Sequence, residues 1–275
     1  MDKEKEELFD EIDDSRQNDS KKAFIIIVIF IIALIIAVLS IFGYKWYRDY
    51  KANSTYEDIT DYVHITEYPP EVTGKELIDN PVEFGKLQAI NDEIYAWIYV
   101  PNTRVNYPVA QSRVDDEFYL HRDYNKNYLF AGTIFSESCN KLDFSDPVTV
   151  LYGHNMYESE GTMFTTLHFF ENSEFFNDNE YFYIYMPGHI LKYRIVSAFK
   201  YDNRHIMNSF DFSEDKVVKE FFDTVSNPDS LLKNVREEAK LKEGDKLLIL
   251  STCVSGDKSS RFLVNGVLIE DERTK

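Results

Sequence analysis

An uncharged apolar run near the start of the chain limits what this protein can be. Residues Ala23 to Phe42 read AFIIIVIFIIALIIAVLSIF, twenty residues without a charged side chain. As an α-helix rising about 1.5 Å per residue, the run would span roughly 30 Å, the thickness of a bilayer's hydrocarbon core. The alternative is a cleavable signal peptide. Its apolar stretch usually has about 7–15 residues and ends in an A-x-A-like site, and the sequence GYKW at residues 43–46 provides none. We therefore predict an uncleaved anchor over residues 23–43.

The rest of the chain has the composition of one folded domain with an acidic surface. Its 275 residues leave room for a single ordinary domain with accessory segments, and 44% hydrophobic residues supply a core. The formal net charge of −18 would repel a phosphate backbone, so we expect no nucleic-acid partner. Two cysteines, Cys139 and Cys253, are too few for a disulfide framework. They leave two options, a single bridge or a thiol kept for chemistry.

The segment after the anchor has helical patterning. A short helix is predicted from Lys51 to Glu67, ended by Pro69-Pro70. A second is predicted from Asn80-Pro81, a capping residue followed by proline at the first helical position, to about Asn91. Further along, an apolar face between residues 217 and 225 predicts one more helix, with Ser213 as its cap.

From Ile94 onward, side chains that alternate between two faces predict β-strands. Pro187-Gly188 lies between two of these runs and indicates a hairpin. Many short strands with few helices favour a mainly β protein with a closed or nearly closed barrel. The predicted strands are Ile94–Val100, Ala131–Ser136, Val148–Tyr152, Tyr181–Met186, Ile190–Phe199, Lys246–Thr252 and Arg261–Ile269.

Three residues at strand ends have the chemistry of a thiol active site. The apolar run KLLILSTC ends in Cys253, the run VTVLYGHNM carries His154, and Arg261 opens the strand that follows the cysteine. A thiolate is the reactive form of cysteine, and a neighbouring imidazolium or guanidinium favours it. The histidine could then protonate a departing amine. The arginine could hold the substrate backbone or a developing oxyanion.

These motifs resemble the signature of the sortases, and of class B in particular. The resemblance extends over roughly Phe84 to Ile269 and includes the segments WIYVPNTRVNYPVAQS, FYLHRDY and AGTIFSE. It implies an eight-stranded sortase-type closed β-barrel with N-terminal helices, one helix inserted before the cysteine strand, and a single N-terminal transmembrane helix. It also implies a catalytic trio of His154, Cys253 and Arg261. No metal or cofactor is expected, because the other histidines lack a shared ligand spacing.

The resemblance further implies positions that contact the substrate. Leu120, Tyr152, Ile206 and Ser251 fall at groove positions, and the backbone N–H of Val254 would join Arg261 at the oxyanion. The chain also departs from the family. Where the cysteine strand usually has a threonine, this chain has Ile249, which we interpret as a change in packing. The loop from Val254 to Ser260 is short, so the sequence of the substrate peptide stays open.

The resemblance also gives an expected arrangement of the chain at the cell surface. Residues 1–22 would form a cytoplasmic acidic tail, expected to be disordered, residues 23–43 the single membrane span, residues 44–80 a linker with the N-terminal helix, and residues 81–275 the extracellular catalytic domain. The implied reaction cleaves a C-terminal sorting peptide of secreted surface proteins through a thioacyl enzyme. An amine of a peptidoglycan precursor or of another protein then takes the acyl group.

Two alternatives stay open at this point. A pilin polymerase on the class B fold would use a lysine of a pilin as its amine. Such enzymes often carry a second, C-terminal span, and the lack of a second apolar run here favours wall anchoring. A membrane-tethered binding module would need the thiol only for structure. A papain-like hydrolase is disfavoured, because its cysteine precedes its histidine and lies on a helix.

Overall fold

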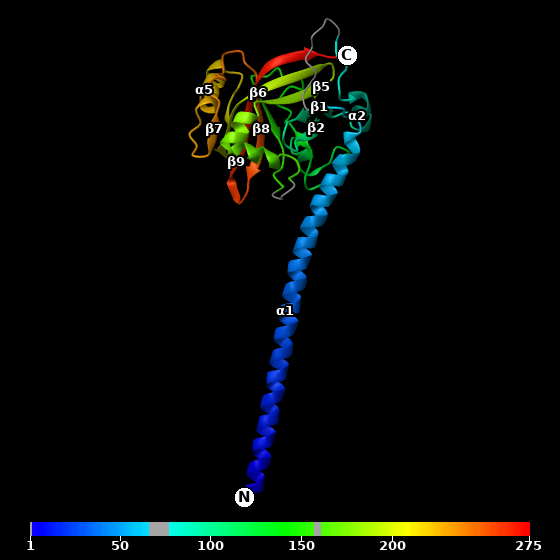
Figure 1. Ribbon diagram of the computed structural model, residues 1–275, viewed down its shortest axis with the longest axis vertical. Coiled ribbons are helices and arrows are strands. Elements are labelled where there is room, and N and C mark those ends of the chain that lie inside the picture. Colours follow the sequence, from blue (N-terminus) through cyan, green and yellow to red (C-terminus); the bar gives the residue numbers. More distant parts are fainter. Residues whose placement is uncertain (1, 66–76, 157–160) are drawn as a thin grey trace. The chain divides into compact units, whose positions relative to one another are not determined.

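The computed structural model describes residues 2–65, 77–156 and 161–275 (Figure 1). The chain divides into two compact units, Met1–Tyr50 and Lys51–Lys275. We treat each unit by itself.

The first unit is helical throughout its described part. Helix α1 covers Asp2–Thr60, so its last ten residues belong to the second unit. Apolar side chains from Phe24 to Phe42 are largely exposed, and this helix is long and apolar enough to cross a membrane. The acidic tail, expected to be disordered, is helical. A helix nucleated on the apolar run can extend into preceding residues rich in Glu and Lys.

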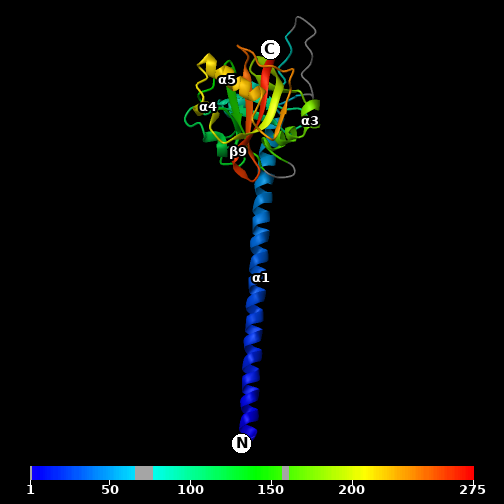
Figure 2. The ribbon, with the colours of Figure 1, turned by 90° about the vertical axis from the view of Figure 1, so that its left-hand side faces the viewer.

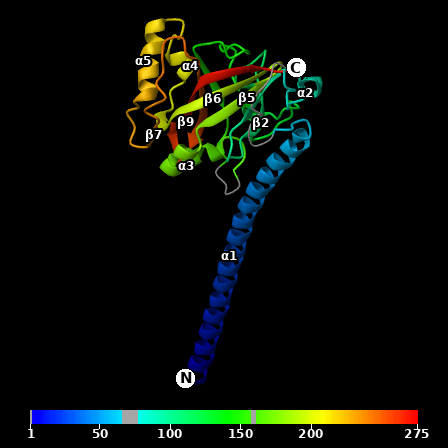
Figure 3. The same ribbon diagram turned by 45° about the horizontal axis from the view of Figure 1, so that its top comes forward.

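The second unit contains the predicted eight-stranded closed barrel (Figures 1 and 3). Its strands follow one another in the order β5-β1-β2-β3-β4-β8-β9-β6, and β6 pairs with β5 to close the ring. β7 pairs with β6 outside the ring. Only β2–β3 and β4–β8 pair in parallel among the named strands. The strands are β1 Ile94–Tyr99, β2 Asn106–Ala110, β3 Ile134–Phe135, β4 Val148–Tyr152, β5 Tyr181–Met186, β6 His189–Asp202, β7 Lys233–Val235, β8 Leu247–Val254 and β9 Asp257–Arg273.

Most predicted strands are confirmed, with differences that have local causes. β5 and β6 form the hairpin predicted at Pro187-Gly188, where Gly188 adopts φ +81°. β2 was not predicted, because Pro108 interrupts its alternating pattern and proline cannot donate to a ladder. β9 begins at Asp257, before Arg261, because a tight turn joins it directly to β8.

Short helices cover the barrel. They are α2 Phe84–Ile90, α3 Ser173–Asp178, α4 Ile206–Ser209 and α5 Asp215–Ser226, with 3-10 segments η1 Phe118–His121 and η2 Thr165–Glu171. Helix α2 starts three residues later than predicted, because Asn80 accepts a bond from the Val82 amide and Val82 pairs with Val63. The cap of α5 is Glu214 rather than Ser213. The first predicted helix ends at Thr60, and Pro69-Pro70 lies outside the described residues.

The strand β8 divides the core into two layers. Successive side chains of a strand point to opposite faces. Leu248 and Leu250 therefore pack in the larger cluster, whereas Leu247 and Ile249 pack in a second cluster with side chains of α4 and α5. Helices α4 and α5 lie next to each other over this outer face (Figures 2 and 3). Ile249 is fully buried there, as its interpretation as a packing residue requires.

Candidate active site

Strand register brings the three predicted catalytic residues to one rim of the barrel. Partners in the parallel β4–β8 ladder are 99 residues apart throughout, and His154 and Cys253 are also 99 residues apart. The ladder continues past β4, because the Gly153 amide donates to the Ser251 carbonyl over 3.2 Å. On the other side of β8, Cys253 pairs directly with Arg261 of β9. The histidine and the arginine therefore flank the cysteine at the same level.

Cys253 lies on the outer face of the barrel. It follows Leu247, Ile249 and Ser251 at every second position, so its side chain emerges on the face that α5 covers further along the strand. Its side chain is partly exposed, as are those of His154 and Arg261. A nucleophile must meet its substrate, and this exposure permits it. Both Cys253 and Cys139 are free thiols, so no disulfide blocks the site.

A backbone carbonyl fixes the orientation of His154. The Nε2 atom of its ring lies 2.9 Å from the carbonyl oxygen of Leu120 in η1. Because a carbonyl oxygen only accepts, Nε2 must carry the proton of this bond. The rings of His121 and Phe130 stack on the imidazole at centroid distances of 5.2 and 5.5 Å. The imidazole ring of His154 is thereby held in place.

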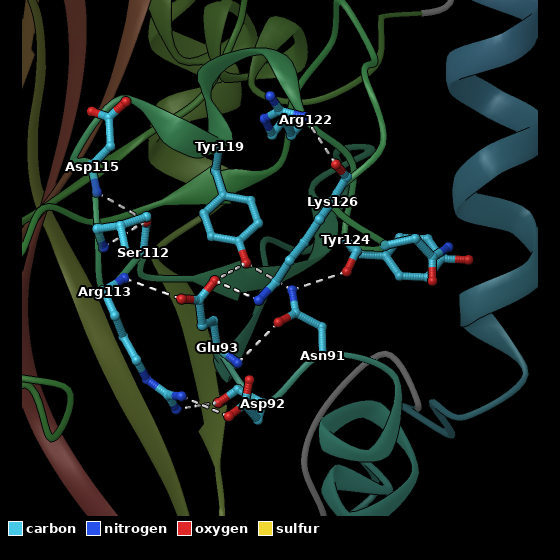
Figure 4. A network of polar contacts seen from close by, with 12 residues as sticks. Asn91, Asp92, Glu93, Ser112, Arg113, Asp115, Tyr119, Arg122, Tyr124 and Lys126 are labelled. Carbon is cyan, nitrogen blue, oxygen red and sulfur yellow. Dashed lines mark hydrogen bonds and ion pairs between the residues drawn. The ribbon is translucent and has the colours of Figure 1, made fainter.

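A buried polar network holds η1, the segment that supplies this carbonyl (Figure 4). The hydroxyl of Tyr119 donates to Glu93 over 2.6 Å and accepts from Asn91 over 2.8 Å. Lys126 pairs with the same Glu93 carboxylate at 3.0 Å. Burial raises the pKa of Tyr119, so its hydroxyl stays protonated and continues to donate. Leu120, the next residue, therefore follows a fixed turn.

A cavity of about 210 Å³ opens beside the three residues. Cys253, His154 and Arg261 all line it. Of the predicted substrate-contacting residues, four line it as well, namely Leu120, Tyr152, Ile206 and Ser251. The fifth, Val254, does not line the cavity, and its side chain packs against the larger core cluster.

A hydrogen bond joins two loops that line the cavity. His205, from the loop between β6 and α4, has its Nε2 atom 2.6 Å from Glu137, which follows β3. Burial raises the pKa of Glu137, and the bond to His205 offsets this only in part. Among the described residues, the buried hydroxyl of Tyr152 lacks a hydrogen-bond partner.

The sequence did not point to every residue at the site. Glu137 and His168 were not recognised. His168 lies in η2, and its Nε2 atom is 3.0 Å from the carbonyl oxygen of Cys253. Its only signal in the sequence is Glu171, one helical turn further on, and such spacing is common on surfaces.

The chain matches the family model of the sortase domain over residues 98–269. This chain belongs to the sortase family. The curated Sortase B of Listeria monocytogenes is 24% identical over 245 residues, which cover 86% of this chain and 96% of that protein. The predicted enzyme class, a cysteine transpeptidase, is thereby confirmed.

Solved structures of class B sortases share the fold. Sortase B of Clostridium perfringens has a TM-score of 0.59 and 31% identity, covering 68% of this chain and all of that one. A class B sortase of Streptococcus pyogenes, described as involved in pilus biogenesis, has a TM-score of 0.58 and 27% identity, covering 68% and 98%. The barrel is therefore that of a class B sortase.

Proposed function

We propose that this sortase is anchored by residues 23–43 with its N-terminus in the cytoplasm, and that its catalytic domain, residues 81–275, cleaves sorting peptides outside the cell. The observation that carries the proposal is the strand register, which sets His154 and Arg261 on either side of Cys253 beside one cavity. The exposed apolar surface of α1 supports the anchor, because lipid would cover it.

In the proposed reaction, the Cys253 thiolate attacks the carbonyl carbon of the scissile peptide bond. The C–N bond breaks, the amine leaves with a proton from His154, and a thioacyl enzyme remains. An acceptor amine then attacks the thioester, gives up a proton to His154, and releases the thiolate. Arg261 donates fork-like hydrogen bonds to the substrate backbone or to the oxyanion. Tyr152, which lines the cavity, contacts the peptide.

The test uses the full chain in detergent micelles with quenched peptides of the NPQTN and LPxTG types. We expect cleavage that an added amine accelerates and that Cys253→Ala and His154→Ala abolish. Arg261→Lys keeps the charge but loses the fork, and should lower the rate by about 10²–10³. Cys139→Ala is the matched control, because Cys139 is the other free thiol and does not line the cavity. Equal cleavage by the wild type and Cys253→Ala would sink the proposal.

Pilin polymerisation is the second candidate, because the similar class B sortase of S. pyogenes is described as involved in pilus biogenesis. The two functions differ only in the acceptor amine. Incubating the thioacyl enzyme with a peptidoglycan stem peptide and with a lysine-bearing protein, at equal amine concentration, separates them. We expect the stem peptide to resolve the thioester faster. A preference for the protein lysine would favour the polymerase.

A further inference from the structure

Two side chains contact the backbone carbonyl oxygen of Cys253. The amide nitrogen of Asn155 donates to this oxygen over 2.9 Å, and Nε2 of His168 lies 3.0 Å from it. Asn155 follows the predicted acid/base residue His154, whereas His168 comes from η2, 85 residues before the cysteine. We call Asn155, His168 and Glu171 the carbonyl clamp.

The histidine of the clamp is itself fixed on both sides. Its Nδ1 atom lies 2.5 Å from a carboxylate oxygen of Glu171. Its ring stacks on Phe262 of β9 at a centroid distance of 4.9 Å. Its Nε2 atom lies 2.9 Å from the amide nitrogen of Asn155 as well as 3.0 Å from the Cys253 carbonyl oxygen, so the two side chains contact each other and the carbonyl. Such a ring has little freedom to turn away from the carbonyl.

The Cys253 carbonyl lies near the C-terminal end of β8. There, pairing with the neighbouring strands is not the only constraint on the backbone. The register between β8 and β9 is irregular just after Cys253, between it and Val254. A peptide unit is planar, so fixing its oxygen also fixes the Cα of Cys253 and the amide of Val254. The position of the sulfur relative to the cavity therefore depends on the clamp as well as on the strand.

We propose that His168, oriented by Glu171 and assisted by Asn155, is a positioning residue for the nucleophile Cys253. This inference rests on the proposed function of Cys253. His168 does not line the cavity and is not expected to touch the substrate. It acts on the distance and angle at which the sulfur meets the scissile carbonyl, and such alignment governs the chemical step more than substrate binding.

The experiment compares full-length variants in the Cys139→Ser background, which leaves Cys253 as the only thiol. His168→Leu removes the imidazole contacts to the Cys253 carbonyl and to Asn155, and we expect kcat for peptide cleavage to fall by about 10–100-fold with KM nearly unchanged, since small misplacements cost this much. His168→Gln can still donate an amide N–H to the carbonyl and should recover most of kcat. Alkylation of Cys253 by iodoacetamide needs no fixed alignment, so its rate should stay within about twofold.

Matched variants make the result specific. His189 also pairs with a carboxylate, that of Asp271 at 2.6 Å. It lies at the start of β6, whereas Arg261 pairs near the end of β6, so His189→Leu should leave kcat unchanged. If His168→Leu does not fold, Asn155→Asp, of nearly equal size, removes a donor from the same carbonyl and should lower kcat in the same way.

Three outcomes would overturn the inference. They are full activity in His168→Leu, equal losses in His168→Gln and His168→Leu, and an alkylation rate that falls as far as kcat does. The last would mean that His168 acts on formation of the thiolate. A wild type without Cys253-dependent cleavage would instead refute the proposed function itself.

Discussion

At the scale of single residues, Gly153 decides where His154 can lie. The backbone at Gly153 passes so close to its neighbours that an added Cβ would lie 2.5 Å from Ile134 and 2.7 Å from Phe164. The φ of Gly153 is not in the left-handed region, so lack of space, and not backbone conformation, is what requires a glycine there. The tight packing holds the turn that leads from β4 to the histidine.

We therefore expect Gly153→Ala to lower the free energy of unfolding by about 1–3 kcal/mol, the usual cost of overpacking. Peptide cleavage should fall as well, because the displaced backbone carries His154 with it. Thermal unfolding and kcat are the measurements. Gly85 in α2 is the control, since an added Cβ meets nothing within 4 Å. Normal unfolding and cleavage in Gly153→Ala would show that the turn tolerates the methyl group.

The residues that the sequence pointed to are those with a local signal. Cys253, His154 and Arg261 each lie at the end of an apolar strand, which a linear pattern displays. Glu137 and His168 have no such signal. Their partners, His205 and Cys253, are 68 and 85 residues away, and only the folded chain brings them together.

At the scale of elements, the last turns of α1 are part of the catalytic unit. Ala52 and Ile59 are buried there, and the hydroxyl of Tyr56 donates to the Gly132 carbonyl over 2.5 Å. Gly132, at φ +61°, lies against the backbone of Leu120, whose carbonyl binds His154. Burial raises the pKa of Tyr56, so the phenol stays protonated and keeps donating. The helix thus supports the histidine indirectly.

Tyr56→Phe should leave the buried Gly132 carbonyl without this donor and lower the free energy of unfolding by about 1–3 kcal/mol. We expect a smaller effect on kcat, at most about tenfold, because Leu120 is also held by the network around Tyr119. Chemical denaturation and peptide cleavage measure the two effects. Tyr128→Phe is the control, since Tyr128 is 68% exposed. Equal unfolding of Tyr56→Phe and the wild type would rule out this support.

The hairpin between Cys253 and Arg261 depends on one carboxylate. Asp257 accepts hydrogen bonds from Ser259 and Ser260 and pairs with Lys200 of β6 at 2.7 Å. The bond to Lys200 is the main cause that holds the pKa of Asp257 far below its usual 3.8. A lowered pKa means that the ionised form stabilises the fold. This contribution is present above pH 3.8 and is lost as the pH falls further.

Asp257→Asn should therefore unfold at a lower temperature than the wild type at neutral pH, and the difference should shrink below pH 3.8. Calorimetry of both proteins between neutral and acidic pH measures it. Asp79→Asn, at an exposed carboxylate that pairs with Lys275, provides the control. A difference that stays constant across this range would show that the charge of Asp257 contributes nothing.

At the scale of the whole molecule, the fold class was predictable and the pairing of distant strands was not. Alternation within each run predicts a β-barrel, because it depends only on neighbouring residues. Nothing in that alternation says that β4 pairs in parallel with β8, 99 residues away, although this pairing creates the site. The resemblance to sortases supplied the arrangement that local patterns lacked.

The anchor gives a prediction that depends on the whole apolar run. Its sixteen Ile, Leu, Val and Phe residues favour insertion by roughly 5–10 kcal/mol, and one central arginine costs only about 2.5–3.5 kcal/mol. Ile32→Arg alone should therefore stay in the membrane. Adding Ile31→Arg and Ile35→Arg raises the cost to roughly 7.5–10.5 kcal/mol, whereas the thirteen remaining residues supply only roughly 4–8 kcal/mol.

We expect alkaline extraction to release the triple arginine variant from the membrane. The Ile32→Arg variant should stay in the membrane pellet, and so should a control with leucine at the same three positions. The released protein should still cleave peptide, because the unit from Lys51 onward is compact by itself. If the triple arginine variant stays in the pellet, a different part of the chain holds this sortase at the membrane.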